Sequence, residues 1–111
     1  MNNINSYKIT SKTSIRDAFE YMTSKHLEIC VYVDNKDKVQ GIFTKGDLKR
    51  AVFKKINLDG DLKVLLNKNF IYLQKNYSDD QVKKIFTETI IQQLPVINNG
   101  YLIDVINKKN F

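Results

Sequence analysis

A hydroxyl and a carboxylate lie three residues apart at the point where an apolar run passes into a helical pattern. Residues 41–50 read GIFTKGDLKR, in which Gly41, Thr44 and Asp47 stand at regular intervals of three. The apolar residues before Thr44 are typical of a strand, and the apolar spacing after Asp47 predicts a helix. At such a junction the hydroxyl, free backbone N–H groups and the carboxylate converge at the positive end of the helix, where a phosphate can bind.

The same pair also has a purely structural interpretation. Thr44 at the N-cap and Asp47 at the third helical position can form a capping box, in which each side chain accepts a hydrogen bond from the other residue's backbone N–H. Such a cap stabilises a helix start by about 1 kcal/mol and requires no ligand. Lys45, Lys49 and Arg50 follow on the helix, where they either meet phosphates or form a solvated face. The spacing alone leaves both interpretations open.

The chain contains an internal repeat. The motif returns 63 residues later with three substitutions, and the matched pairs are Gly41 and Asp104, Thr44 and Asn107, and Asp47 and Asn110. Upstream the offset is 64, so that segments 7–9 and 30–33 match segments 71–73 and 94–97. The offset falls by one because the second copy has a shorter turn, Asn98-Asn99-Gly100.

Two copies of strand, helix, strand, tight turn, strand and helix resemble a tandem pair of cystathionine-β-synthase-type (CBS) domains, called a Bateman module. The resemblance covers nearly the whole chain, and its most specific element is G-x-x-T-x-x-D at residues 41–47. Leu94-Pro95-Val96 is similar to the second strand of the family. The wording of residues 41–51 is similar to CBS pairs attached to bacterial sugar-phosphate nucleotidyltransferases and isomerases. Because the segment begins at Met1, the N-terminal pair of a nucleotidyltransferase fits better.

The resemblance implies an α/β (α+β) fold in which two β-α-β-β-α repeats pack through their sheets into one pseudo-two-fold module. We expect the first repeat at residues 1–56, a connector at 57–68 and the second repeat at 69–111. A chain of 111 residues can bury a sizeable core only if the two repeats share it. The second repeat stops where its last helix should begin, which indicates a truncated copy or a helix that continues in a longer protein.

In the family, the motif contacts the phosphate and ribose of a nucleotide in the cleft between repeats. The resemblance implies that Thr44 and Lys45 bind phosphate and that Asp47 accepts hydrogen bonds from ribose hydroxyls. Ile9 and Ile29 are the expected apolar walls for the base. The implied ligand is an adenine nucleotide (AMP, ADP or ATP) or a nucleotide-activated sugar, and no cofactor is required.

A second site is expected to be weak or absent. Asn107 and Asn110 replace the hydroxyl and the carboxylate, and an amide pairs less strongly with ribose hydroxyls than a carboxylate does. Asp104 in place of the glycine adds bulk and negative charge beside any phosphate. We therefore expect one competent nucleotide site or none.

Three functional classes follow from these patterns. The first is a regulatory module that binds a nucleotide and controls an attached or partner enzyme, which the resemblance indicates is a sugar-phosphate nucleotidyltransferase. The alternative is a structural dimerisation module with degenerate sites, and in both cases the helices of the repeats would form a homodimer. An enzyme is disfavoured because His26 and Cys30 are the only residues of their kinds, which leaves no triad and no histidine-based metal cluster.

Composition narrows the partners and the compartment. The net charge of +6 comes from 18 basic residues, of which only Arg16 and Arg50 are arginines, and these charges are scattered along the chain. That distribution does not favour a nucleic-acid module. No stretch reaches the roughly 20 apolar residues of a membrane span, and Met1–Asn5 begin no signal peptide, so we expect a cytoplasmic protein without a membrane partner. Cys30, within an apolar run, is expected to pack as a small hydrophobe.

Overall fold

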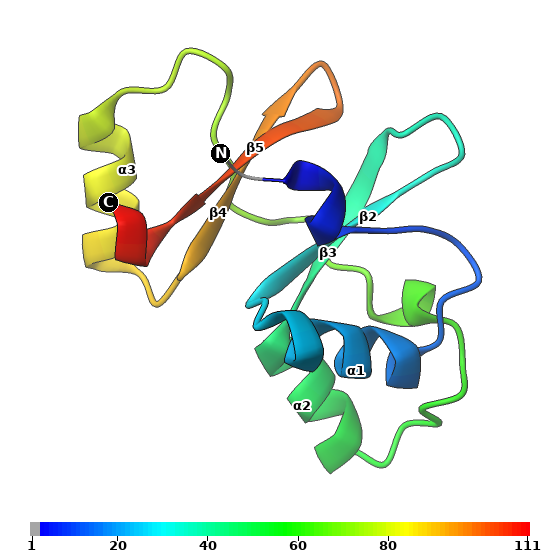
Figure 1. Cartoon of the computed structure of the whole chain (residues 1–111). Coiled ribbons are helices and arrows are strands. Elements are labelled where there is room, and N and C mark those ends of the chain that lie inside the picture. Colours follow the sequence, from blue (N-terminus) through cyan, green and yellow to red (C-terminus); the bar gives the residue numbers. More distant parts are fainter. Residues whose placement is uncertain (1–2) are drawn as a thin grey trace.

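Two β-hairpins, each packed against helices, form the framework of the molecule (Figure 1). The structure is a computed structural model and describes residues 3–111. Three strands form the first sheet, in the order β1-β2-β3, with β1 parallel to β2 and β2 antiparallel to β3. Two antiparallel strands form the second sheet. The strands are β1 (Lys8–Ile9), β2 (Ile29–Val33), β3 (Val39–Thr44), β4 (Gln93–Asn98) and β5 (Tyr101–Asn107).

Three α-helices and three short 3-10 helices join these strands. The α-helices are α1 (Ile15–Lys25), α2 (Lys45–Phe53) and α3 (Asp79–Glu88), and the 3-10 helices are η1 (Ile4–Tyr7), η2 (Leu62–Leu65) and η3 (Lys108–Asn110). Each α-helix starts at a hydroxyl residue, Ser14, Thr44 or Ser78, whose side chain accepts from the backbone N–H three positions on. The predicted helix starts are confirmed, because these caps satisfy donors that the helix itself cannot pair.

The second hairpin repeats the pairing of the first, 64 residues later. In β2 and β3 the register shifts between Tyr32 and Val33, and in β4 and β5 it shifts between Val96 and Ile97. Leu73 bridges Val96 in parallel, as Ile9 in β1 pairs with Tyr32. The expected mixed α/β fold is therefore present, with the same irregularity in both hairpins.

A shared apolar core connects the two hairpins. All five residues of β2 are buried, as the continuous apolar run predicts. The main core cluster also includes Ile97, Leu102 and Val105 from the second hairpin, and a smaller cluster lies beneath α3. Cys30 is completely buried, and burial raises the pKa of its thiol to about 12, which keeps it protonated and unreactive near neutral pH.

One predicted core residue lies at the surface instead. We expected Ile90 to continue the buried stripe of the helix that starts at Ser78, but α3 ends at Glu88 and Ile90 is 93% exposed. Thr89 ends the helix because its backbone is extended, and it thereby turns Ile90 away from the stripe. Among residues 3–111, no helix is long and apolar enough to cross a membrane.

Candidate functional site

A cleft of about 410 Å³ opens beside the N-terminus of α2 and is lined by residues of both hairpins and of the segment that joins them. Its apolar lining includes Ile29, Ile42, Phe70, Ile71, Ile91 and Pro95. Its polar lining includes Thr44, Lys45, Gly46, Arg50, Asn67 and Asn69. The predicted residues Thr44, Lys45 and Ile29 thus meet at one cleft, although Thr44 and Ile29 are 15 positions apart in the sequence.

The capping box that the sequence predicts forms at this helix start. The Thr44 Oγ1 atom accepts from the Asp47 backbone N–H at 3.1 Å, and the Asp47 Oδ2 atom accepts from the Thr44 backbone N–H, also at 3.1 Å. Because the Thr44 oxygen acts as an acceptor in this bond, its own O–H remains available to donate toward the cleft. The cap is therefore compatible with a ligand contact by Thr44.

Fewer backbone donors are available here than the sequence suggested. We expected several free N–H groups at the start of α2, but the Thr44 and Asp47 groups are used in the capping box. The Lys45 N–H donates to the Glu28 carbonyl at 3.0 Å, which ties the helix start to the residue before β2. Gly46 lies next along the helix and lines the cleft, and its N–H is the donor that remains for an anion.

Asp47 and Arg50 form an ion pair at the edge of the cleft. The Arg50 guanidinium donates to the Asp47 Oδ1 atom, and the two residues are one helical turn apart. Arg50 lines the cleft, whereas Asp47 lies behind it with a side chain that is 21% exposed. The sequence analysis placed Arg50 only among the basic residues of the helix, although its spacing of three from Asp47 is the signal of such a pair.

Ile9 does not line this cleft. It is buried in the main core and borders a separate hollow beside α1, together with Thr13 and Tyr21. The strand order explains the separation: β1 lies at one edge of the first sheet, whereas the joining segment pairs with β3 at the other edge, through Ile42 and Asn67. The sequence suggested no strand order, so it could not show which wall faces the cleft.

The expected second-site residues lie in different surroundings. Asn107 is buried, and its side chain links the Gln93 amide to the Tyr7 hydroxyl, with bonds of 2.7 Å and 3.2 Å. Asn110 lies exposed in η3 at the end of the chain. Gln93 was not predicted as a functional residue, although a polar amide at the start of the apolar run of β4 was a signal in the sequence.

Fold and site together define the class of this protein. Residues 2–54 match the model of the CBS domain family, so this part of the chain is a CBS domain. A CBS-domain-containing protein from Agrobacterium tumefaciens superposes with a TM-score of 0.79 at 28% identity, covering 93% of this chain and 83% of that chain. A CBS domain protein from Pyrobaculum aerophilum complexed with AMP superposes with a TM-score of 0.79 at 16% identity, covering 99% and 89%, which shows likeness of fold alone.

Two curated relatives carry the similar segment within longer proteins. An inosine-5'-monophosphate dehydrogenase from Nitrosopumilus maritimus is 29% identical over 99 residues, which are 89% of this chain and 20% of the relative. A homoserine O-acetyltransferase from Methanococcus vannielii is 28% identical over 107 residues, 92% of this chain and 21% of the relative. The chain therefore spans about a fifth of the length of these relatives. It is a regulatory CBS module, and the structure describes no catalytic domain in residues 3–111.

Proposed function

We propose that this chain binds a nucleotide in the cleft beside α2 and thereby controls an attached or partner enzyme. The observation that carries the proposal is the division of one small cleft into two chemical halves. Apolar side chains form one part, and a helix N-terminus with two cations, Lys45 and Arg50, forms the other. A nucleotide has the matching division, because its base is apolar on both faces and its phosphate is an anion.

The phosphate would bind at the start of α2. The Gly46 N–H and the Thr44 O–H are donors there, and the helix dipole favours an anion at this end. Lys45 and Arg50 supply positive charge, whereas Glu28 is the acidic residue in the lining. Two cations against one carboxylate suit a ligand with a small negative charge better than a neutral one.

The ribose would bind at Asp47 once Arg50 has changed partner. In the described structure, Asp47 uses one oxygen for the capping box and the other for Arg50. When the Arg50 guanidinium moves to the phosphate, the Oδ1 atom becomes free to accept from vicinal ribose hydroxyls. The Oδ2 atom keeps the cap, so ligand binding does not disrupt the helix start.

The base would lie among the apolar side chains of the cleft. Ile29 and Ile42 are buried at its floor, whereas Ile71 is 46% exposed and Ile90 93% exposed at its border. Covering these two exposed side chains with a flat base removes apolar surface from water, which stabilises the complex. The AMP in the Pyrobaculum aerophilum protein and in another structural neighbour, CBSX2, supports an adenine nucleotide as the ligand.

The remaining expectations from the sequence are part of this proposal. We propose that residues 1–56 and 69–111 are the two CBS repeats, joined by a connector at 57–68. The module acts in the cytoplasm on a sugar-phosphate nucleotidyltransferase, on the resemblance of residues 41–51. The two curated relatives are other enzymes, in which a similar segment makes up about a fifth of the length, and they support a regulatory module joined to an enzyme.

Calorimetry and thermal unfolding with AMP, ADP and ATP test nucleotide binding. A ligand that binds only the folded state at a hundredfold excess over Kd adds about 2.7 kcal/mol of stability, which raises Tm by about 10 °C in a chain of this size. Lys45→Met should weaken binding, because Lys45 lines the cleft, whereas Lys49→Met removes the same charge from the same helix outside the cleft lining and should not. If no nucleotide shifts Tm at millimolar concentration, the proposal is wrong.

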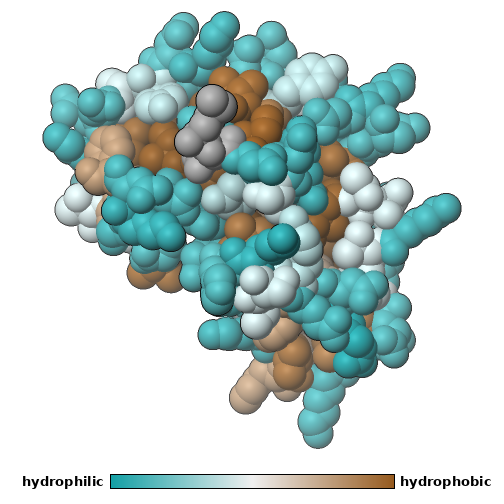
Figure 2. Space-filling model, in the orientation of Figure 1, coloured by the Kyte–Doolittle hydropathy of each residue, from teal (hydrophilic) through white to brown (hydrophobic). Residues whose placement is uncertain are grey.

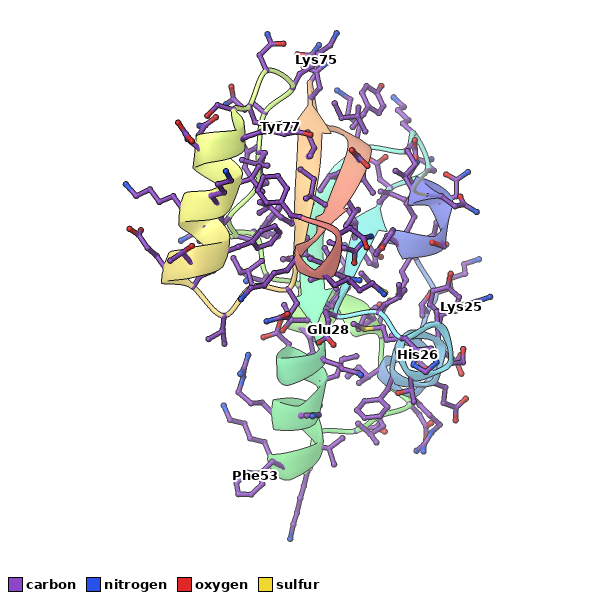
Figure 3. The ribbon with its side chains drawn as sticks, turned by 60° about the vertical axis from the view of Figure 1, so that its left-hand side comes forward. Lys25, His26, Glu28, Phe53, Lys75 and Tyr77 are labelled. Carbon is purple, nitrogen blue, oxygen red and sulfur yellow. The ribbon has the colours of Figure 1, made fainter. Side chains whose placement is uncertain are left out.

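The alternative is a structural dimerisation module, and exposed apolar side chains on α2 favour it. Val52 is 48% exposed and Phe53 88% exposed. Phe53 projects from the end of the helix (Figure 3), on a surface that is otherwise largely hydrophilic on the face shown in Figure 2. Sedimentation at about 50 µM, in the range of ordinary micromolar affinities, is expected to give twice the chain mass of 13.0 kDa. Phe53→Asp should give the monomer, and a wild-type monomer would contradict the homodimer.

A further inference from the structure

The repeat defines a second position that corresponds to the nucleotide cleft. Shifting the cleft residues by the offset of the repeat relates Ile71 to Tyr7, Ile29 to Gln93 and Thr44 to Asn107. The two positions differ in how they are filled, because Ile71 is 46% exposed at the border of the open cleft, whereas Tyr7 is 7% exposed. A side chain of the chain itself thus occupies the space that the base would take in the first cleft.

Tyr7 is fixed there by a chain of buried hydrogen bonds. Its hydroxyl accepts from the Asn107 Nδ2 atom at 3.2 Å, and the Asn107 Oδ1 atom accepts from the Gln93 Nε2 atom at 2.7 Å. The Gln93 Oε1 atom then accepts from two backbone N–H groups at the start of β2, those of Glu28 at 2.8 Å and Ile29 at 3.2 Å. Every amide orientation in this series follows from the backbone donors at its end.

A second set of contacts holds the rest of the segment. The helix η1, drawn in dark blue, lies between the two hairpins and contacts β2 of the first and β5 of the second (Figure 1). The Tyr21 hydroxyl in α1 donates to the Ser6 carbonyl at 2.6 Å, and the Asn3 side chain caps η1 by accepting from the Asn5 N–H. The residue that corresponds to Tyr21 in α3 is Ile85, which has no hydroxyl to make such a bond.

We propose that residues 3–7, the N-terminal plug, fill the second cleft, so that the chain binds one nucleotide instead of two. This inference rests on the proposed function only for the identity of the ligand. The sequence attributed the weakness of the second site to lost polar groups at Asn107 and Asn110. The structure assigns the exclusion to occupied space, because Asn107 and Gln93 hold the plug and do not face a ligand.

Calorimetry with AMP separates the two explanations. Wild-type protein is expected to bind one equivalent. Asn107→Thr restores the hydroxyl of the motif but leaves the Tyr7 ring in place, so it should still bind one equivalent. Tyr7→Ala combined with Asn107→Thr opens the cleft and restores the hydroxyl, and it should bind a second equivalent at least tenfold more weakly than the first. Retention of the first binding event shows that this variant is folded.

Two results would overturn the inference: two equivalents of AMP bound by the wild type or by Asn107→Thr, or no second equivalent in the double variant. Hydrogen exchange provides a readout without ligand, so that it stays valid if AMP does not bind at all. The backbone amides of residues 5–8 are expected to exchange at least tenfold more slowly in the wild type than in Tyr7→Ala, with Tyr7→Phe between them. Fast exchange of these amides in the wild type would show that the plug is open.

Discussion

Replacing Gly41 with alanine is expected to lower the free energy of unfolding by about 3 kcal/mol. A Cβ atom at Gly41 would lie 2.6 Å from the Asn67 carbonyl oxygen and 2.6 Å from side-chain atoms of Leu66. The segment at 66–67 would have to move away from β3, which would break the paired hydrogen bonds between Ile42 and Asn67, of 3.0 Å and 3.1 Å. Urea unfolding followed by circular dichroism measures the change.

Gly46→Ala is the matched control for this prediction. A Cβ atom at Gly46 has the flexible end of the Arg50 side chain as its nearest neighbour, at 3.4 Å. Because Gly46 lies within α2, alanine there should change stability by less than about 1 kcal/mol, in the stabilising direction. Equal effects of the two substitutions would show that the close approach of the joining segment to Gly41 is not what requires glycine in the motif.

Replacing Asp47 with asparagine is expected to weaken AMP binding by about tenfold to a hundredfold. An amide accepts through one oxygen only, so it cannot both keep the cap to the Thr44 N–H and accept from the ribose hydroxyls. The stability of the ligand-free protein should fall by less than about 1 kcal/mol, since asparagine is still a short polar residue in the first helical turn. Calorimetry with AMP and thermal unfolding without it give the two values.

Asp17→Asn is the control for a change at the same helical position. Asp17 is the third residue of α1, its N–H donates to Ser14 in the N-cap, and it does not line the nucleotide cleft. Its replacement should leave AMP affinity unchanged. If Asp47→Asn lowers Tm and leaves affinity unchanged as well, Asp47 is only a helix cap, and the ribose contact proposed for it is wrong.

The local elements of this protein could be predicted from its sequence because their signals act over short distances. The continuous apolar run of β2 predicted a strand buried on both faces, and Thr44 with Asp47 predicted the start of α2. Strand pairing over a tight turn and helix capping both depend on residues within a few positions of one another. The offset of 64 residues also predicted that both hairpins share one pattern, and the register shift occurs at corresponding positions in both.

Part of the candidate site was accessible in the same way. Thr44 and Lys45 lie at the cleft because the helix start places them there, and the spacing of the motif predicts that start. Ile29 reaches the same cleft because the antiparallel pairing of β2 with β3 sets it opposite Thr44. These placements follow from local geometry together with a single hairpin.

Only the tertiary structure decided which groups remain available to a ligand. The Lys45 N–H pairs with Glu28, and Gln93 pairs with the start of β2 from 64 residues away in the sequence. Ile9 faces a different hollow because β1 lies at the edge of the sheet opposite the joining segment. Tyr7 meets Asn107 across 100 positions of the chain. Contacts between residues so far apart depend on how the sheets pack, and hydrophobic periodicity within one segment has no information on that packing.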